Sequence, residues 1–255
     1  MTTENDTLVC LLDVLGFESI FNKLGLETIE SKYKELISVV EKQNIQVAIS
    51  RTSDGVPAMF SPNISYAYFS DTIIFWCKYD VFRMEVFLSC MSELLCDSIE
   101  IGLPLRGSVS VGQVIIDKEK GIYLGQPIIA AARAESVQKW IGITMSKTFD
   151  KAPYCGGFKA DVILQYDKHL KDGGKDKVIP LAIDFPRFWR TKRQTSIVDA
   201  INKLNSDLNF AEYYNNTLDF VKYSEDNHDW WTKQPEFIEE EERRKNHELK
   251  EQNKI

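Results

Sequence analysis

The order of apolar and polar residues along the first part of the chain predicts alternating strands and helices. A continuous apolar run within 7–13 is too short for a core helix and predicts a buried strand. Apolar residues recur at helical spacing over 17–24 and over 28–41, and 46–51 has the pattern of a short strand. We expect a loop after it, because the next stretch contains residues that oppose regular structure, namely Gly55, Pro57 and Pro62.

The middle of the chain has a hairpin pattern followed by a strongly amphipathic helical pattern. Two strand-like runs, 64–69 and 72–76, flank Ser70-Asp71, which predicts a β-hairpin that turns at or near these two residues. Residues 81–99 place large apolar side chains along one side of an expected helix. The segment 105–116 alternates apolar and small residues and predicts a strand or a pair of strands.

The alternation continues to about residue 183 and then stops. Residues 121–124 read as short and extended, and Pro127 suits the first turn of a helix over 128–138. Further strands are expected at 141–145, 162–166 and 178–183. The order strand-helix-strand-strand-helix-strand, followed by a further helix and strand, predicts an α+β fold of the ferredoxin-like βαββαβ type. Beyond it, 199–221 has a helical pattern, and the charged run 236–254 is either a solvated helix or a frayed tail.

Composition narrows the function classes. The chain has 255 residues, 44% of them hydrophobic, which suits one large domain or a domain with an appendage. A net charge of −7 argues against a nucleic-acid partner. Five cysteines without CxxC spacing and three scattered histidines argue against zinc and are typical of free thiols. The polar, acidic start and the lack of an apolar run of ~18–20 residues predict a soluble cytoplasmic protein with no membrane partner.

Two aspartates carry the candidate chemistry. Asp13 ends the first apolar strand just before a glycine turn, and Asp71 lies at the expected hairpin turn. Hard divalent cations prefer oxygen ligands, and a site that also binds a triphosphate needs only a couple of carboxylates. The pair therefore points to phosphoryl-transfer chemistry. The alternative for each aspartate alone is a turn former or a helix N-cap.

Four pieces of sequence around these aspartates occur in an order that resembles the class III nucleotidyl cyclases. They are Asp13-Val14-Leu15-Gly16-Phe17, Ser70-Asp71, Leu105-Arg106-Gly107-Ser108-Val109-Ser110-Val111-Gly112 and Gly125-Gln126-Pro127-Ile128-Ile129-Ala130-Ala131-Ala132-Arg133. The resemblance covers 7–145. It implies a nucleotide cyclase catalytic domain over 1–190 and a helical C-terminal extension with a charged tail over 191–255.

The resemblance also implies a role for each matched residue of the first two pieces. Asp13 and Asp71 would hold two Mn²⁺ or Mg²⁺ ions per site, with the Val14 carbonyl as a further ligand. The β- and γ-phosphates would face the backbone N–H groups of Leu15, Gly16 and Phe17. Glycine at position 16 would permit a close approach that a side chain would block.

The two arginines of the later pieces have competing interpretations. Arg133 would stabilise the negative charge that develops on the α-phosphorus, and the family's head-to-tail homodimer would deliver it from the partner subunit. Its alternative partners are Glu135 and Asp150. Arg106 is either part of the matched motif or an edge-strand surface cation.

Departures from the family pattern bear on the base. Ile129 stands where many of these cyclases have an asparagine that positions the ribose, and Ala67 and Ile122 stand where purine cyclases have polar base-reading groups. These losses make the chain most similar to the pyrimidine (uridylate or cytidylate) cyclases of bacterial Pycsar antiphage defence. Arg51 and then Tyr68 are the candidates for base binding, and an arginine, which only donates hydrogen bonds, favours UTP over CTP.

Two other interpretations stay open at this point. The chain could be an adenylate or guanylate cyclase, or a non-catalytic cyclase-like module that binds a nucleotide without turnover. The loss of the asparagine at Ile129 favours the non-catalytic module, whereas retention of Asp13, Asp71 and Arg133 opposes it.

Overall fold

The centre of the molecule is a seven-stranded sheet with the strand order β10-β11-β9-β6-β1-β5-β4. It is seen in a computed structural model that describes residues 6–45, 48–51, 57–60, 63–149, 162–205 and 208–235, together with the positions 238, 242, 245 and 246. The strands of this sheet are β1 (Thr7–Val14), β4 (Ser65–Phe69), β5 (Thr72–Lys78), β6 (Leu105–Gly112), β9 (Gly142–Ser146), β10 (Ile163–Gln165) and β11 (Val178–Ile183).

Four neighbouring strands of the sheet and two helices form the ferredoxin-like core. In chain order these are β1, α2 (Leu26–Ile45), β4, β5, α3 (Val81–Ile101) and β6. The strands lie in the order β6-β1-β5-β4, and each adjacent pair is antiparallel. The predicted fold class is therefore confirmed, and so is the hairpin, because Phe69 pairs with Thr72 across Ser70-Asp71.

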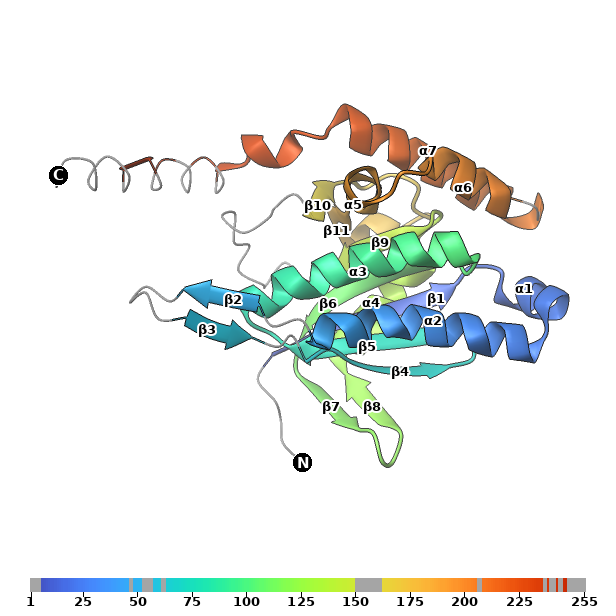
Figure 1. Cartoon of the computed structure of the whole chain (residues 1–255), viewed down its shortest axis with the longest axis horizontal. Coiled ribbons are helices and arrows are strands. Elements are labelled where there is room, and N and C mark those ends of the chain that lie inside the picture. The colour runs from blue at the N-terminus through green and yellow to red at the C-terminus, as the bar shows by residue number, and fades with distance from the viewer. Residues whose placement is uncertain are drawn as a thin grey trace.

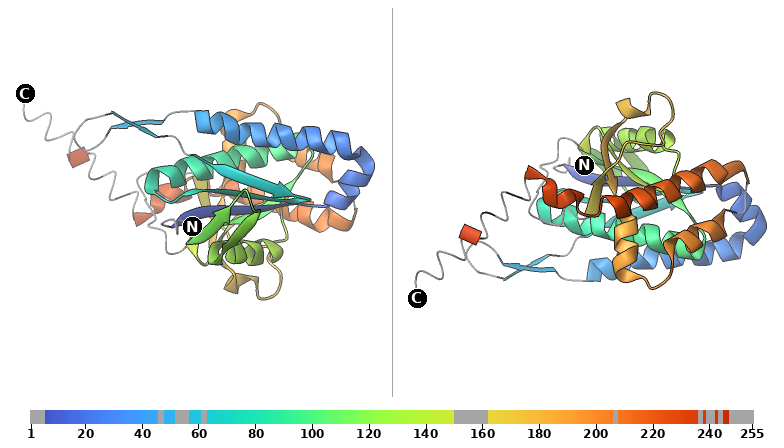
Figure 2. Two further views of the ribbon diagram at one scale, coloured as in Figure 1. Left: turned by 90° about the horizontal axis from the view of Figure 1, so that it is seen from below. Right: turned by 90° about the horizontal axis from the view of Figure 1, so that it is seen from above.

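Both faces of this sheet are covered, which explains the continuous apolar run in the first strand. Leu8, Cys10 and Leu12 of β1 belong to the main core, whereas Val9 and Leu11 belong to a smaller cluster on the opposite face. Side chains alternate between the two faces of a strand, so burial of both faces demands apolar residues throughout. Figure 2 shows α2 and α3 on one side of the sheet and α4 (Gln126–Ser136) on the other.

Two hairpins project from the sheet (Figure 1). One pairs β7 (Val114–Asp117) with β8 (Ile122–Gly125), so the segment over 105–116 is a pair of strands. The other pairs β2 (Ala48–Arg51) with β3 (Pro57–Phe60). The expectation of a loop through Pro57 is therefore wrong. A proline is tolerated there because it is the first residue of the strand.

Helices of the C-terminal part add to the main core: the first two pack against α3, and the longest packs against those two (Figure 1). They are α5 (Phe185–Lys192), α6 (Ile197–Leu204), η4 (Leu208–Phe210), α7 (Ala211–Asp226) and η5 (Trp230–Lys233), with η3 (Gly174–Asp176) before them. The single helix predicted over 199–221 is instead two, since Asn205 leaves helical geometry with φ −74 and ψ 56. Residue 190, the expected last residue of the catalytic domain, lies inside α5. The sequence pattern did not predict this helix.

The first helix after β1 completes the part of the fold that surrounds the site. It is α1 (Phe17–Leu24), and it begins directly after the turn that follows Asp13.

Among the described residues, no helix is both long and apolar enough to cross a membrane.

Candidate active site

Asp13 and Asp71 meet at neighbouring strand ends. Asp13 is the penultimate residue of β1 and pairs with Thr72, the residue directly after Asp71, in the register of β1 and β5. The backbone N–H of Val14 donates to the carbonyl of Asp71 over 3.0 Å, which ties the hairpin turn to the end of β1. The structure thus brings together the two acids that the sequence singled out.

The environment of Asp13 disfavours its charge. Burial raises the pKa of the Asp13 carboxyl, and the nearby Asp71 raises it further, whereas Arg106 lowers it. Burial is the largest cause, so the net pKa lies above the ordinary value of 3.8. A second negative charge beside a partly buried carboxylate is the arrangement that a bound cation would relieve.

Arg106 is the third charged group of the site. It pairs with Asp13 in the register of β1 and β6, and its Nη2 lies 3.2 Å from Asp13 Oδ2. Its Nε lies 2.8 Å from Glu135 Oε1, and its Nη1 donates to the carbonyl of Gln138 over 3.3 Å. The alternative of an edge-strand surface cation is wrong, because β6 lies between β1 and β9 and the Arg106 side chain is only 16% exposed.

Glu135 is carried to this cluster by α4. Its side chain is 11% exposed, and burial raises the pKa of its carboxyl above the ordinary 4.5 even though Arg106 lowers it. One guanidinium therefore lowers the pKa of two carboxyls whose pKa values burial raises. The partner of Glu135 is Arg106, so the alternative pairing of Glu135 with Arg133 does not occur.

The turn after Asp13 lies at the N-terminus of α1. Gly16 has φ 72, a left-handed conformation that favours glycine, and its carbonyl accepts the first helical hydrogen bond from Ile20 N–H. The Leu15 N–H donates to the carbonyl of Pro104 over 2.9 Å, so this group is already engaged. The first N–H groups of a helix lack partners within the helix, and at α1 these begin with Phe17.

A groove lined mainly by apolar and aromatic side chains runs from Asp71 along α1 and α2. It has a volume of about 650 Å³, and its lining includes Phe17, Tyr33 and Tyr68. The Tyr33 hydroxyl donates to the Ser70 carbonyl over 2.9 Å and its ring lies 5.7 Å from that of Tyr68. Burial, then Asp71 and Asp13, raise the pKa of Tyr33, so its hydroxyl keeps its proton.

The two candidates for base binding are Tyr68, which borders this groove, and Arg51. The Tyr68 side chain is 53% exposed at the end of β4. Arg51 ends β2, and its side chain lies outside the described residues. Of the two residues at the expected purine-reading positions, Ala67 packs against the smaller apolar cluster that contains Val9 and Leu11, and Ile122 is the first residue of β8.

Arg133 is not part of the cluster around its own Asp13. It lies on the exposed side of α4, while Glu135, two residues further on, is buried toward Arg106. Residues two apart on a helix face in different directions, so Arg133 points away from this site. Ile129, one turn earlier on the same side, is 47% exposed.

The donor set of the site fits a metal that is shared with a substrate. Asp13 and Asp71 offer carboxylate oxygens, and Val14 adds a carbonyl at the end of β1. In the portion of the chain that the structure describes, no three or more His, Cys, Asp or Glu side chains form a group that could hold a metal ion. Mg²⁺ and Mn²⁺ sites of phosphoryl-transfer enzymes commonly complete their coordination with phosphates and water.

Sequence reasoning missed the groups that support the two aspartates. Arg106 belongs to one of the four matched pieces of sequence, but its position opposite Asp13 depends on strand register, which no local pattern reveals. Glu135 lies two residues after Arg133, and only the docking of α4 shows that it faces inward. The inward position of Tyr33 could be predicted, because this residue lies on the apolar side of the predicted helix over 28–41.

Comparisons with known proteins give weak likenesses. No protein-family model matches the chain, and no curated protein matches it. The solved guanylate cyclase domain of RhGC from Catenaria anguillulae in complex with GTP is 12% identical, with a TM-score of 0.47, covering 67% of this chain and 94% of that one. The catalytic core of a rhodopsin-guanylyl cyclase with converted specificity, in complex with ATPalphaS, is 12% identical with a TM-score of 0.43, covering 67% and 93%. Both TM-scores lie below 0.5, so the case for an activity depends on the residues of the site.

Proposed function

We propose that the protein is a metal-dependent nucleotide cyclase. The observation that carries the proposal is the meeting of Asp13 and Asp71 at adjacent strand ends, beside the glycine turn that opens α1. The reaction would convert a nucleoside triphosphate to its 3′,5′-cyclic monophosphate and pyrophosphate. The 3′-oxygen of the ribose bonds to the α-phosphorus, the bond from that phosphorus to the bridging oxygen breaks, and the 3′-hydroxyl proton leaves to solvent.

The residues of this chain would bind and orient the substrate. Two Mn²⁺ or Mg²⁺ ions, when bound, would lower the pKa of the 3′-hydroxyl and neutralise the charge on the phosphates. Asp13 and Asp71 would hold them, and Arg106 would keep Asp13 ionised and in place from its other side. Since Leu15 N–H is engaged by Pro104, the phosphates would meet the N–H groups of Gly16 and Phe17.

The proposal includes a head-to-tail homodimer with shared sites. Arg133 points away from its own Asp13, so it could reach an α-phosphate only in the site of a partner subunit. Exposed apolar side chains on two pairs of residues support such an interface: Leu124 of β8 with Ile129 of α4, the helix that carries Arg133, and Tyr68 with Phe69 of β4, just before Asp71. A dimer with two-fold symmetry would bring one of these surfaces against the other twice.

We further propose a pyrimidine substrate, with UTP preferred to CTP, and a product that serves as a second messenger in antiphage defence of the Pycsar type. Ala67 and Ile122 offer no hydrogen bonds to a purine edge. Tyr68, which borders the groove beside Asp71, and Arg51 are the candidates for reading the smaller base. The alternative of an adenylate or guanylate cyclase is compatible with the same metal site, and so is a non-catalytic nucleotide-binding module.

A competition assay tests the substrate assignment. The protein is incubated with Mn²⁺ and equal concentrations of the four nucleoside triphosphates, and the cyclic products are identified by mass spectrometry. We expect cyclic UMP or cyclic CMP as the main product. Cyclic AMP or cyclic GMP in excess would overturn the pyrimidine assignment and leave the cyclase standing, whereas no cyclic product at all would favour the binding module.

A further inference from the structure

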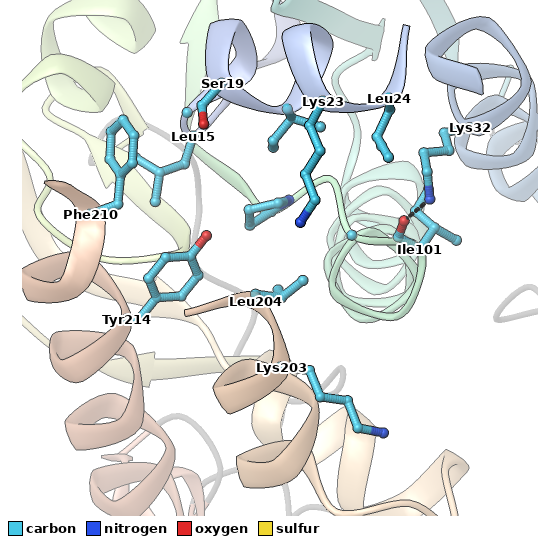
Figure 3. A pocket seen from close by; sticks show the side chains of 14 residues that line it. Leu15, Ser19, Lys23, Leu24, Lys32, Ile101, Lys203, Leu204, Phe210 and Tyr214 are labelled. Carbon is cyan, nitrogen blue, oxygen red and sulfur yellow. Dashed lines mark hydrogen bonds between the residues drawn. The ribbon is translucent and has the colours of Figure 1, made fainter. Parts of the chain in front are cut away.

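The C-terminal segment η4–α7 reaches the proposed site with two aromatic rings. A Cβ added at Gly16 would lie only 3.0 Å from Cε2 of the Phe210 ring, so this ring rests directly on the turn after Asp13. The Tyr213 ring lies under the Arg106 guanidinium, with 5.5 Å between its centroid and Cζ. Figure 3 shows Phe210 beside Leu15, on the wall of a cavity of about 200 Å³ between α1 and the C-terminal helices.

The segment is anchored independently of these two rings. The Thr217 hydroxyl oxygen accepts a buried hydrogen bond from the Ile141 N–H over 2.9 Å. Asn216 donates to the Lys139 carbonyl over 2.7 Å, and Glu212 lies 2.9 Å from the Lys139 ammonium. These contacts fix α7 on the same stretch of chain whose Gln138 carbonyl accepts from Arg106. The aromatic rings therefore sit on a fixed support.

The Arg106 guanidinium lies over the face of the Tyr213 ring and also contacts two carboxylates. Arg106 donates to Asp13 Oδ2 from Nε over 3.3 Å and from Nη2 over 3.2 Å, and its Nε also lies 2.8 Å from Glu135 Oε1 as an ion pair. A cation over an aromatic face is attracted by the ring quadrupole, and the contact strengthens when water is excluded. Without the ring, water would reach the guanidinium and weaken its hold on Asp13.

We propose that Tyr213 is a positioning residue for the metal site, acting through Arg106 on Asp13. The inference rests on the proposed function, because it requires that Asp13 and Asp71 bind Mn²⁺. It states that the C-terminal segment increases the affinity of this site for the ion. A ring that only packs α7 onto the core would affect stability without affecting Mn²⁺. The two roles therefore differ in a measurable way.

Tyr223 provides a matched control on the same helix. Its ring lies 5.3 Å from that of Tyr166 and carries the Lys168 ammonium over its face at 4.6 Å. This is also a tyrosine under a cation, but neither partner belongs to the cluster around Asp13. Replacement of Tyr223 by Leu should loosen α7 to a similar extent and leave the metal site alone.

The experiment measures Mn²⁺ binding by the electron paramagnetic resonance signal of the free ion, together with the midpoint of thermal unfolding. Binding that is lost in Asp71→Asn defines the site. We expect Tyr213→Leu to raise the Kd for Mn²⁺ about five-fold, the ordinary worth of a partly desolvated cation–π contact, and Tyr213→Phe to leave it unchanged. Pentafluorophenylalanine at position 213 keeps the shape and reverses the ring quadrupole, so it should raise the Kd like leucine.

Three results would overturn the inference. They are an unchanged or lower Kd in Tyr213→Leu, an unchanged Kd with the fluorinated ring, or an equal rise in Tyr223→Leu. Absence of specific Mn²⁺ binding by the unmodified protein is a separate outcome, since it would overturn the proposed function and this inference with it.

Discussion

Replacement of Arg106 by Met should destabilise the metal-free protein strongly at neutral pH. Methionine keeps most of the side-chain length but leaves Asp13 and Glu135 without their shared cation. The side chains of Arg106, Asp13 and Glu135 are 16%, 21% and 11% exposed. Little water can therefore reach the two carboxylates to replace the guanidinium. Removing one partner of a buried ion pair costs about 3–5 kcal/mol, and partial exposure puts this case near the lower end, at about 3 kcal/mol.

The pH dependence of this loss provides the sharper test. In the unmodified protein the pKa values of Asp13 and Glu135 are raised, so their effect on stability is favourable at low pH and is lost as pH rises through the folded-state values. Arg106 lowers both pKa values, so its removal raises them further. The cost of Arg106→Met should therefore shrink as pH falls from about 7 to about 4.5, because increasing protonation of the two carboxyls removes negative charge that the missing guanidinium would have balanced.

The assay is urea unfolding of the metal-free protein at both pH values, with Lys120→Met as the control. Lys120 also pairs with an aspartate, Asp117, but its side chain is 73% exposed, so its loss should cost far less stability than the loss of Arg106. A cost for Arg106→Met below about 1 kcal/mol, or a cost that does not change with pH, would refute the bridging role of Arg106.

Three further predictions address assembly, base selection and fold. Mixing inactive Asp71→Asn with inactive Arg133→Ala should restore activity under conditions where subunits exchange, because a mixed dimer gathers both defects in one site; no recovery would mean that Arg133 does not act across an interface. Arg51→Ala should lower turnover of pyrimidine triphosphates far more than Mn²⁺ binding, and unchanged turnover would reject this residue alone. Gly107→Ala should cost more than about 3 kcal/mol in unfolding measurements, since its Cβ would lie 2.2 Å from the Leu11 carbonyl oxygen, and near-normal stability would contradict the β1–β6 register.

The sequence was sufficient for the features that depend on neighbouring residues. The strand ending at Asp13 is marked by a continuous apolar run, and the hairpin around Asp71 by two such runs with a short turn between them. Because both aspartates belong to strand ends, their meeting followed once the two strands were adjacent. The spacing of apolar residues and the residue types at turns are local properties of the sequence, and they are sufficient to predict the ferredoxin-like core.

The groups that support the site depend on contacts between distant segments. Arg106 faces Asp13 because of the register of two strands 93 positions apart, and Tyr213 reaches Arg106 only because α7 docks on the stretch that contains Gln138. The break near Asn205 had a local signal in the turn-forming residues there, but the helical spacing on both sides masked it. Register and docking are set by the whole core, so a pattern read along the chain does not contain them.

The most direct test of the central claim is product analysis from a single pyrimidine triphosphate with Mn²⁺. The protein is incubated with UTP, and in parallel with CTP, and cyclic nucleotide and pyrophosphate are both quantified. We expect equal amounts of the two products from the unmodified protein and neither product from Asp13→Asn or Asp71→Asn. Each variant should remain folded, because removing one charge relieves repulsion between neighbouring carboxylates. Full activity in these two variants, or release of inorganic phosphate without any cyclic nucleotide, would contradict this expectation.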